Sequence, residues 1–472
     1  MSLAELEALE TLKRCTKTSA LIYAGQYEEA RSVLGDLWRG IGERPSIDNQ
    51  PPEVGAEILL QCASLSGFLG DARARDVYER TKDLLTEALR VFESLGNEAK
   101  VSEAKYELGI CYYRVGAYDE ARIVLNETLN EATAEQHGKI VIGRALVEIF
   151  SGRCGEAQEI LINARPFFDT ASDALKARWH AHMGLVQRRL ARGAIEHLDR
   201  ALIEYTAAIY HYELAGHARY CGSNLNNLAF ILYRLGRFAE AHEHLDKAHL
   251  IFSRLRDEGT IAQVEETRAR AFIAEGKYRD AWRVIIGVVE VLERGGESAL
   301  LVDALTNKAI VQARLGDQTR SIQTFKHAIR LGEKSGSFFN AGLAALSLME
   351  EHDLSHKGLY KAYRIADRYL SKTQDEEVFE RLRNCARLAV SQLGGPELSE
   401  DFSLPSVLHE LEGRYIEEAL TRAEGKITKA ARILGVSHQT LIGIISNRHR
   451  QLLGKRTPVY KRRKSIVKKP SD

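Results

Sequence analysis

Seven side chains near the C-terminal end combine hydrogen-bonding groups with positive charge. They are Thr428, Lys429, Arg432, Ser437, His438, Gln439 and Thr440. Side chains of these types donate hydrogen bonds to phosphate oxygens. They also donate hydrogen bonds to base edges, or accept hydrogen bonds from them, in a groove of DNA. Their spacing therefore predicts a site that contacts nucleic acid.

A basic run follows these residues. The whole chain has 66 Lys and Arg against 65 Asp and Glu, yet 13 of the basic residues and only one acid, Asp472, lie after Glu424. The preceding part is left with 53 basic and 64 acidic residues, so a neutral average hides an acidic body and a basic end. Neutralising phosphates releases counterions, which favours a polyanion as partner of that end. The side chains expected to contact DNA here are Asn447, Arg448, Arg450, Lys461, Arg462, Arg463 and Lys464.

These residues need short helices to position them. Apolar residues recur at helical spacing and predict one buried face of a first helix: Leu404, Leu408, Leu411, Tyr415, Ile416, Ala419 and Leu420. Gly425 is expected to end that helix.

A tight turn separates two further helices. Thr428 is expected to cap the second helix, because its hydroxyl can accept an unpaired backbone N–H. Gly435 makes the turn, Val436 fills the core between the helices, and Ser437 caps a third helix over residues 438–447. This order predicts a helix-turn-helix, in which the last helix enters the major groove.

The segment resembles the Fis-type helix-turn-helix family. The phrases that carry the resemblance are residues 415–420, 428–437 and 439–441. The resemblance implies a DNA-binding domain over residues 404–453 that acts as a homodimer, and it implies a bacterial protein.

The sequence departs from the family in the third helix. His438 stands where the family often has arginine, and Ile442 and Gly443 stand where it shows basic residues. We expect Leu441 and either Ile444 or Ile445 in the core, with Ile442 facing outward, where it could contact a thymine methyl group or a partner. The departure predicts weaker base readout.

The rest of the chain contains an internal repeat. Glycines at Gly236, Gly276 and Gly316 are 40 residues apart, and each opens a phrase of the form Gly-x-aromatic-x-acid-Ala or a close variant. Further copies begin at Gly25, Gly116 and Gly152. In each copy the glycine ends one amphipathic helix, and the small residue lets the next helix pack closely against it.

This pattern resembles the tetratricopeptide repeat family in a form of about 40 residues. It implies an all-α fold, with eight or nine helix pairs in an α-solenoid over residues 1–393 that binds a protein or peptide in its groove. Tyrosines of first helices are candidates for that surface or for the core: Tyr106, Tyr112, Tyr113, Tyr220 and Tyr233. Residues 394–403 are expected to form a linker, and residues 454–472 a disordered basic tail.

Other kinds of chemistry lack a motif. No phosphate-binding loop, HExxH or GxSxG occurs, so we expect neither an enzyme nor a cofactor. The six cysteines are scattered without C-x-x-C spacing, which favours reduced core thiols over a metal site or disulfides. No apolar run is long enough to cross a membrane and the N-terminus does not resemble a signal peptide, so we expect a cytoplasmic protein.

Two hypotheses remain open. In the first, the protein is a transcription regulator whose array receives a protein or peptide signal and whose helix-turn-helix binds DNA. In the second, it is a scaffold for protein–protein interaction with only non-specific affinity for DNA. The weakened third helix favours the second somewhat, and the selectivity of DNA binding discriminates between them.

Overall fold

Two units make up the chain. The computed structural model describes residues 3–69, 75–132, 134–191, 195–295, 298–371, 373, 375–394 and 403–455. Contacts divide the chain into unit 1, Met1–Ser391, and unit 2, Gln392–Asp472. The predicted linker falls mostly, and the tail almost wholly, outside the described residues.

Unit 1 is built from helices. In chain order they are α1 (Leu3–Tyr23), α2 (Tyr27–Leu34), α3 (Pro52–Leu69), α4 (Arg75–Ser94), α5 (Glu98–Arg114), α6 (Tyr118–Glu131), α7 (Ala134–Phe150), α8 (Cys154–Asn163), α9 (Arg165–Asp169), α10 (Asp173–Leu190), α11 (Ile195–Leu214), α12 (Ala218–Arg234), α13 (Phe238–Arg254), α14 (Glu258–Glu275), α15 (Tyr278–Gly295), α16 (Ser298–Arg314), α17 (Gln318–Ser335), α18 (Phe338–Glu351), α19 (His356–Leu370) and α20 (Glu376–Gly394). A short 3₁₀ turn, η1 (Gly35–Leu37), follows α2. The described residues contain no strand, and the predicted all-α class is confirmed.

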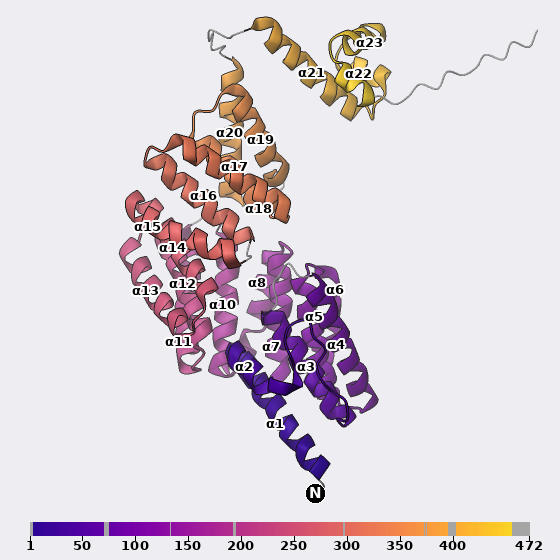
Figure 1. Cartoon of the computed structure of the whole chain (residues 1–472), viewed down its shortest axis with the longest axis vertical. Helices are drawn as coiled ribbons and strands as arrows, with labels where there is room; N and C mark the ends of the chain where they lie inside the picture. Colours follow the sequence, from indigo (N-terminus) through magenta and orange to yellow (C-terminus); the bar gives the residue numbers. More distant parts are fainter. Residues whose placement is uncertain are drawn as a thin grey trace, which may run out of the picture. The chain divides into compact units, whose positions relative to one another are not determined.

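The helices of unit 1 stack as pairs (Figure 1). Within a pair the two helices contact each other, as α12 does α13 and α14 does α15, and each pair packs on the next, as α13 does on α14. The first helices of neighbouring pairs also contact each other: α12 contacts α14, and α14 contacts α16. The short helix α9 is an extra element between the α7–α8 pair and the α10–α11 pair. This arrangement is the predicted tetratricopeptide-like solenoid, in which each pair buries its apolar face against its neighbours.

Glycines make the turns within the pairs, as the repeat predicts. The backbone of Gly236, Gly276 and Gly316 is left-handed, with φ of 75°, 79° and 92°. The further copies at Gly25, Gly116 and Gly152 have φ between 78° and 85°. Only glycine adopts this conformation without a steric cost, so the repeated glycines indicate where the backbone turns in the left-handed conformation.

A second set of turns, between pairs, also has a period of 40 residues, and sequence reasoning missed it. Gly216 and Gly336 have φ of 71° and 77°, and Arg256 stands between them with φ of 53°. An arginine in place of the glycine hides this period from inspection of the sequence. Asp257, directly after Arg256, caps α14 by accepting from the Thr260 N–H at 2.9 Å.

Small residues at the start of the second helices let the pairs pack closely. Ala121, Ala241 and Ala281 are fully buried at this position. In the last good copy Ser321 replaces the alanine and is also fully buried, because its hydroxyl donates to the Ala309 carbonyl at 2.7 Å. The small side chain predicted for close packing is therefore confirmed in these copies.

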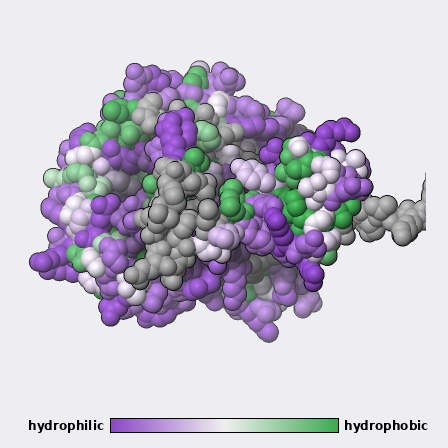
Figure 2. Space-filling model, turned by 90° about the horizontal axis from the view of Figure 1, so that it is seen from above, coloured by the Kyte–Doolittle hydropathy of each residue, from purple (hydrophilic) through white to green (hydrophobic). Residues whose placement is uncertain are grey.

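The tyrosines named from the sequence are partly core residues. Tyr106, Tyr112 and Tyr113 are half-buried and pack on a cluster in α6 and α7, while Tyr220 and Tyr233 pack on a cluster in α11–α13. Each keeps some exposed surface, so core and surface roles coexist. No described helix is both long and apolar enough to cross a bilayer. The face of the molecule in Figure 2 is largely hydrophilic, with apolar side chains in separate patches.

Two glycine substitutions should change stability in opposite directions. Alanine at Gly236 would meet no atom within 4 Å, so the left-handed φ alone should lower the free energy of unfolding by about 1–2 kcal/mol. Alanine at Gly287, inside α15 and also free of contacts, should raise it by about 0.5–1 kcal/mol, because glycine is a poor helix former. Urea unfolding of the two variants measures both effects. A gain in stability from Gly236→Ala would contradict the assigned turn.

Candidate nucleic-acid interface

The described residues of unit 2 form a small domain of three helices. They are α21 (Leu404–Arg422), α22 (Ile427–Ile433) and α23 (His438–Asn447), followed by the 3₁₀ segment η2 (Arg450–Lys455). Its core consists of ten buried residues: Ile416, Ala419, Leu420, Ala423, Ile427, Ala430, Ala431, Leu441, Ile445 and Leu452. Ala430 and Ala431 are the small residues that allow α22 to lie close to its neighbours.

The first turn differs from the sequence prediction in one detail. Glu424 and Gly425 are both left-handed, with φ of 53° and 76°, and the Gly425 N–H donates to the Leu420 carbonyl at 2.9 Å. This compact turn starts α22 at Ile427, with Lys426 at the capping position. The predicted capping role of Thr428 is therefore wrong, because Thr428 already lies inside the helix.

The second turn confirms the roles predicted for Gly435 and Ser437 but not the core position predicted for Val436. Gly435 has φ of 65°, and the Ser437 hydroxyl accepts from the Thr440 N–H at 3.0 Å, so Ser437 caps α23. Val436 is 36% exposed, so it does not fill the core between the helices. Fully buried Leu441, from the first turn of α23, packs in that core instead.

The apolar face predicted for the first helix is only half covered. Ile416, Ala419 and Leu420 are buried, but Leu408 is 55% and Tyr415 63% exposed, and Leu411 is 36% exposed. The reason is length, since α22 and α23 have 7 and 10 residues against 19 for α21. They cannot cover the whole of the longer helix.

The predicted site residues of α22 and α23 lie on the surface. The exposed ones are Thr428, Lys429, Arg432, Ser437, His438, Gln439, Thr440, Asn447, Arg448 and Arg450. Within the described part of the chain, the side chains of Lys429 and Arg432 make no ion pair. Their charges are therefore free to meet phosphates.

The N-terminal end of α23 combines two features that suit an anion. Its first backbone N–H groups have no partner within the helix, and the helix dipole is positive there. His438 and Gln439 are exposed at this end, and no hydrogen bond to either side chain is found among the described residues. Ser437 and Thr440 are less free, because their hydroxyls bind each other at 2.7 Å.

The part of α23 that follows Thr440 offers little to a groove. Leu441 and Ile445 are fully buried, as the sequence predicts. Ile442 is half-buried and packs on the core, so the expectation that it faces outward is wrong in part. Gly443 adds no side chain. Base recognition by α23 would therefore depend on its first turn.

The basic residues after α23 are partly engaged within unit 2. Arg448 forms an ion pair with Glu412 of α21 at 3.2 Å, and Arg450 donates to the Ser446 carbonyl at 3.0 Å. Lys455 pairs with Glu417. The predicted contacts Lys461, Arg462, Arg463 and Lys464 lie outside the described residues.

Sequence reasoning missed a clamp that holds the end of α23 on α21. His449 is 1% exposed and shares a hydrogen bond with Glu412 at 3.0 Å, and its ring stacks on His409 at 4.2 Å. A side chain at Gly413 would meet the His449 ring at 2.8 Å, which explains a glycine inside a helix. That glycine is the signal by which the clamp could have been found.

The clamp is better suited to packing than to metal binding. The ligand atoms of His409, Glu412 and His449 lie within 4.8 Å of one another. However, the two rings are nearly parallel, at 17°, so their nitrogen lone pairs do not converge on one point. Glu412 is also already neutralised by Arg448.

Comparison with known families bears on unit 2. Residues 407–442 match the model of the bacterial regulatory proteins of the Fis family. The C-terminal segment is therefore a Fis-type helix-turn-helix, as predicted. No curated protein sequence matches the chain.

Solved structures resemble the array. One is a signal transduction ATPase with a tetratricopeptide repeat sensor from Pyrococcus horikoshii, with 13% identity and a TM-score of 0.52 over 75% of this chain and 56% of that one. This likeness shows the fold alone, and the chain spans little more than half that protein's length. Lower likeness, at a TM-score of 0.49, is found to a Rap protein solved with the competence and sporulation factor (14% identity, 82% of this chain and 99% of that one). The quorum sensor NprR from B. thuringiensis has the same score (15% identity, 68% and 87%).

Proposed function

We propose, from a Fis-type helix-turn-helix joined to a tetratricopeptide-like array, that this protein is a DNA-binding transcription regulator and not an enzyme. Unit 2 binds DNA, and the array of unit 1 receives a protein or peptide signal. The proposed DNA contacts are those predicted from the sequence, led by the first turn of α23.

One observation carries the DNA-binding half of the proposal. His438 and Gln439 are exposed at the positive end of α23, and the exposed cations Lys429 and Arg432 of α22 make no ion pair with a described residue. In a helix-turn-helix this end of the second helix contacts base edges while the preceding helix crosses the backbone. Phosphate contacts then set the position of the domain, and the two α23 side chains read the sequence.

The structure of the array supports the second half of the proposal, in which unit 1 receives a signal. Repeated helix pairs present a continuous inner layer of first helices, and such surfaces typically bind extended protein segments. Half-buried tyrosines on these helices, such as Tyr220 and Tyr233, combine apolar rings with a polar group. Residues 1–391 of unit 1 carry 51 Lys and Arg against 56 Asp and Glu, and this small acidic excess does not favour DNA as a ligand of the array.

A scaffold function with non-specific DNA affinity is the second candidate. It is favoured by the second turn of α23, where Ile442 packs inward and Gly443 has no side chain. Such a helix offers few groups for direct readout of bases. The two functions differ in how strongly DNA binding depends on sequence.

Selection of DNA sites from a random pool by the full chain tests the proposal. We expect one family of sites to be enriched and to bind at least ~10³-fold more tightly than random DNA at the same salt concentration. A titration of both DNAs by fluorescence anisotropy gives the ratio. If the selected and random DNAs bind alike, the regulator proposal fails and the scaffold function stands.

The uncovered face of α21 supports the proposal that unit 2 forms a homodimer. Leu408, Leu411 and Tyr415 form one exposed apolar stripe at helical spacing. Tyr415→Glu should place a charge in that contact and convert dimers to monomers in sedimentation velocity experiments. Tyr210→Glu, at a 57% exposed tyrosine of α11, is the control and should leave the mass unchanged. A wild-type chain that is monomeric at micromolar concentration would refute the dimer.

A further inference from the structure

The helix ends around Arg188 line a half-open cavity of about 430 Å³ in unit 1. It is lined by the C-terminal ends of α10 and α12, the turn before α8, the start of α18 and the segment before α20. Helices α8, α10 and α18 approach one another near the middle of Figure 1. Its size lies within the usual range for ligand sites, about 300–1,000 Å³.

Two adjacent arginines in the wall have no acidic partner among the residues that the structure describes. Arg188 donates to the Asn227 amide oxygen at 3.2 Å and lies 5.2 Å from the Phe230 ring, and Arg189 lies 4.8 Å from the Phe150 ring. Neither forms an ion pair with a described residue. Desolvation, followed by the charge of Arg188, lowers the pKa of Arg189, as expected for neighbouring cations without an anion.

Acidic side chains in the opposite wall limit the negative charge that a ligand of this cavity can carry. Arg234 is already paired with Glu377 at 2.5 Å, and Asp375 adds a second acid. With three arginines and two acids the lining has a net charge of +1, which suits one carboxylate better than a polyphosphate. Phe230 and Phe339, the latter 44% exposed, provide apolar surface beside the arginines.

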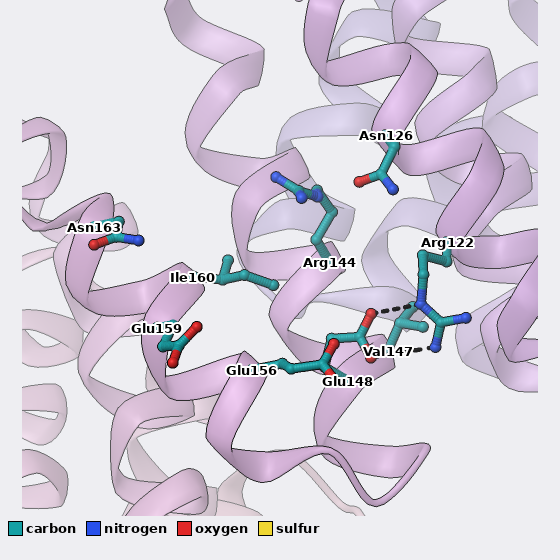
Figure 3. A pocket seen from close by; sticks show the side chains of 9 residues that line it. All are labelled: Arg122, Asn126, Arg144, Val147, Glu148, Glu156, Glu159, Ile160 and Asn163. Atoms are coloured by element: carbon teal, nitrogen blue, oxygen red, sulfur yellow. Dashed lines mark hydrogen bonds and ion pairs between the residues drawn. The ribbon is translucent and has the colours of Figure 1, made fainter.

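A second cavity in the array shows that this arrangement is not general. The cavity of about 320 Å³ between α6, α7 and α8 is drawn in Figure 3. There Glu148 already binds Arg122 at 2.7 Å, and two more acids, Glu156 and Glu159, leave the lining with more acids than arginines. The excess of acids in this lining therefore does not favour the binding of an anion.

We propose that the cavity at Arg188 and Arg189 binds the side-chain carboxylate of a peptide segment in which an acidic residue lies next to an apolar one. Guanidinium N–H groups in the wall bind the carboxylate by charge-assisted hydrogen bonds, which are stronger than neutral ones, and the positive charge of both arginines attracts it. The phenylalanines hold the apolar neighbour. This inference rests on the proposed signal-receiving role of the array and names the chemistry of the signal.

A phage library of random decapeptides, selected on the full chain, tests the inference. We expect the enriched sequences to share an Asp or Glu beside an apolar residue. In a synthetic copy of an enriched peptide, the matching Asn or Gln should lower affinity about 10- to 100-fold by calorimetry. No enrichment, or enrichment without an acidic residue, overturns the proposal.

Variants separate the cavity from the basic end of the chain, which also attracts acidic peptides. Arg189→Gln changes a side chain that is partly desolvated in the cavity wall but still open to solvent, so it should leave the fold intact while lowering peptide affinity about 10- to 100-fold. Arg283→Gln, at a side chain that is 78% exposed on α15, is the matched control and should bind like the wild type. Equal affinity of Arg189→Gln and wild type overturns the proposal. DNA affinity measured on the same variants reports on unit 2 separately, so a failed peptide result leaves the DNA-binding proposal standing.

Discussion

Leu441→Ala should weaken DNA binding by destabilising unit 2 while leaving the array intact. Leu441 is fully buried in the ten-residue core of the domain. Removing a buried leucine side chain costs about 2–5 kcal/mol, and a domain of this size has only about 3–5 kcal/mol of stability. We therefore expect binding to a selected DNA site to weaken by up to about 30-fold, because at the largest loss the unfolded form of unit 2 would be favoured by about 2 kcal/mol.

Hydrogen exchange separates this effect from a loss of contact. Peptides covering α22 and α23 should exchange quickly in Leu441→Ala, while peptides of α12 to α17 should remain as protected as in the wild type, since the two units have separate cores. Val436→Ala is the control. At 36% exposure Val436 should change stability by no more than about 0.5 kcal/mol. Equal losses for the two variants would show that Val436 fills the core after all.

His438→Glu should weaken DNA binding without weakening the fold. His438 is the first residue of α23, where a negative charge interacts favourably with the helix dipole by about 0.3–1 kcal/mol. The same charge would face phosphates, and like charges brought together in an interface cost several kcal/mol. We therefore expect affinity for a selected site to fall about 100-fold while the free energy of unfolding of unit 2 stays the same or rises.

Gln318→Glu controls for the added charge. Gln318 is the exposed first residue of α17, directly after its cap Asp317, so the local chemistry is similar but the position is in the array. This variant should bind DNA as the wild type does. If His438→Glu also leaves affinity unchanged, α23 does not present its first turn to DNA. Fluorescence anisotropy at one fixed salt concentration makes the comparison.

Local features of the structure could be predicted from single residues. Glycines at 40-residue intervals predict left-handed turns, and Gly236, Gly276 and Gly316 have them. Ser437 predicts the cap of α23, whose bounds follow correctly. These predictions hold because a turn or a cap depends on the φ preference and hydrogen bonds of residues within a few positions of one another.

Features that depend on distant neighbours were harder to predict. Val436 is apolar, but whether it is buried depends on how α23 crosses α22 after Gly435. Arg448 has the charge of a DNA contact, yet Glu412, 36 residues earlier, holds it by an ion pair. Thr428 failed as a cap because the two left-handed residues before it start the helix early.

The helix-turn-helix near the C-terminus and the repeat were therefore determined by the sequence itself, since their signals are periodic and local. Only the tertiary structure decided which polar groups remain without partners. Among the described residues it left the side chains of His438, Gln439 and Arg432 without an ion pair or hydrogen bond, paired Arg448 with Glu412, and placed Arg188, Arg189 and Phe339 around one cavity. The reason is that a charge or hydrogen-bonding group is satisfied by whatever packs beside it, and residues 150 positions apart along the chain, such as Arg189 and Phe339, meet only when the helices stack.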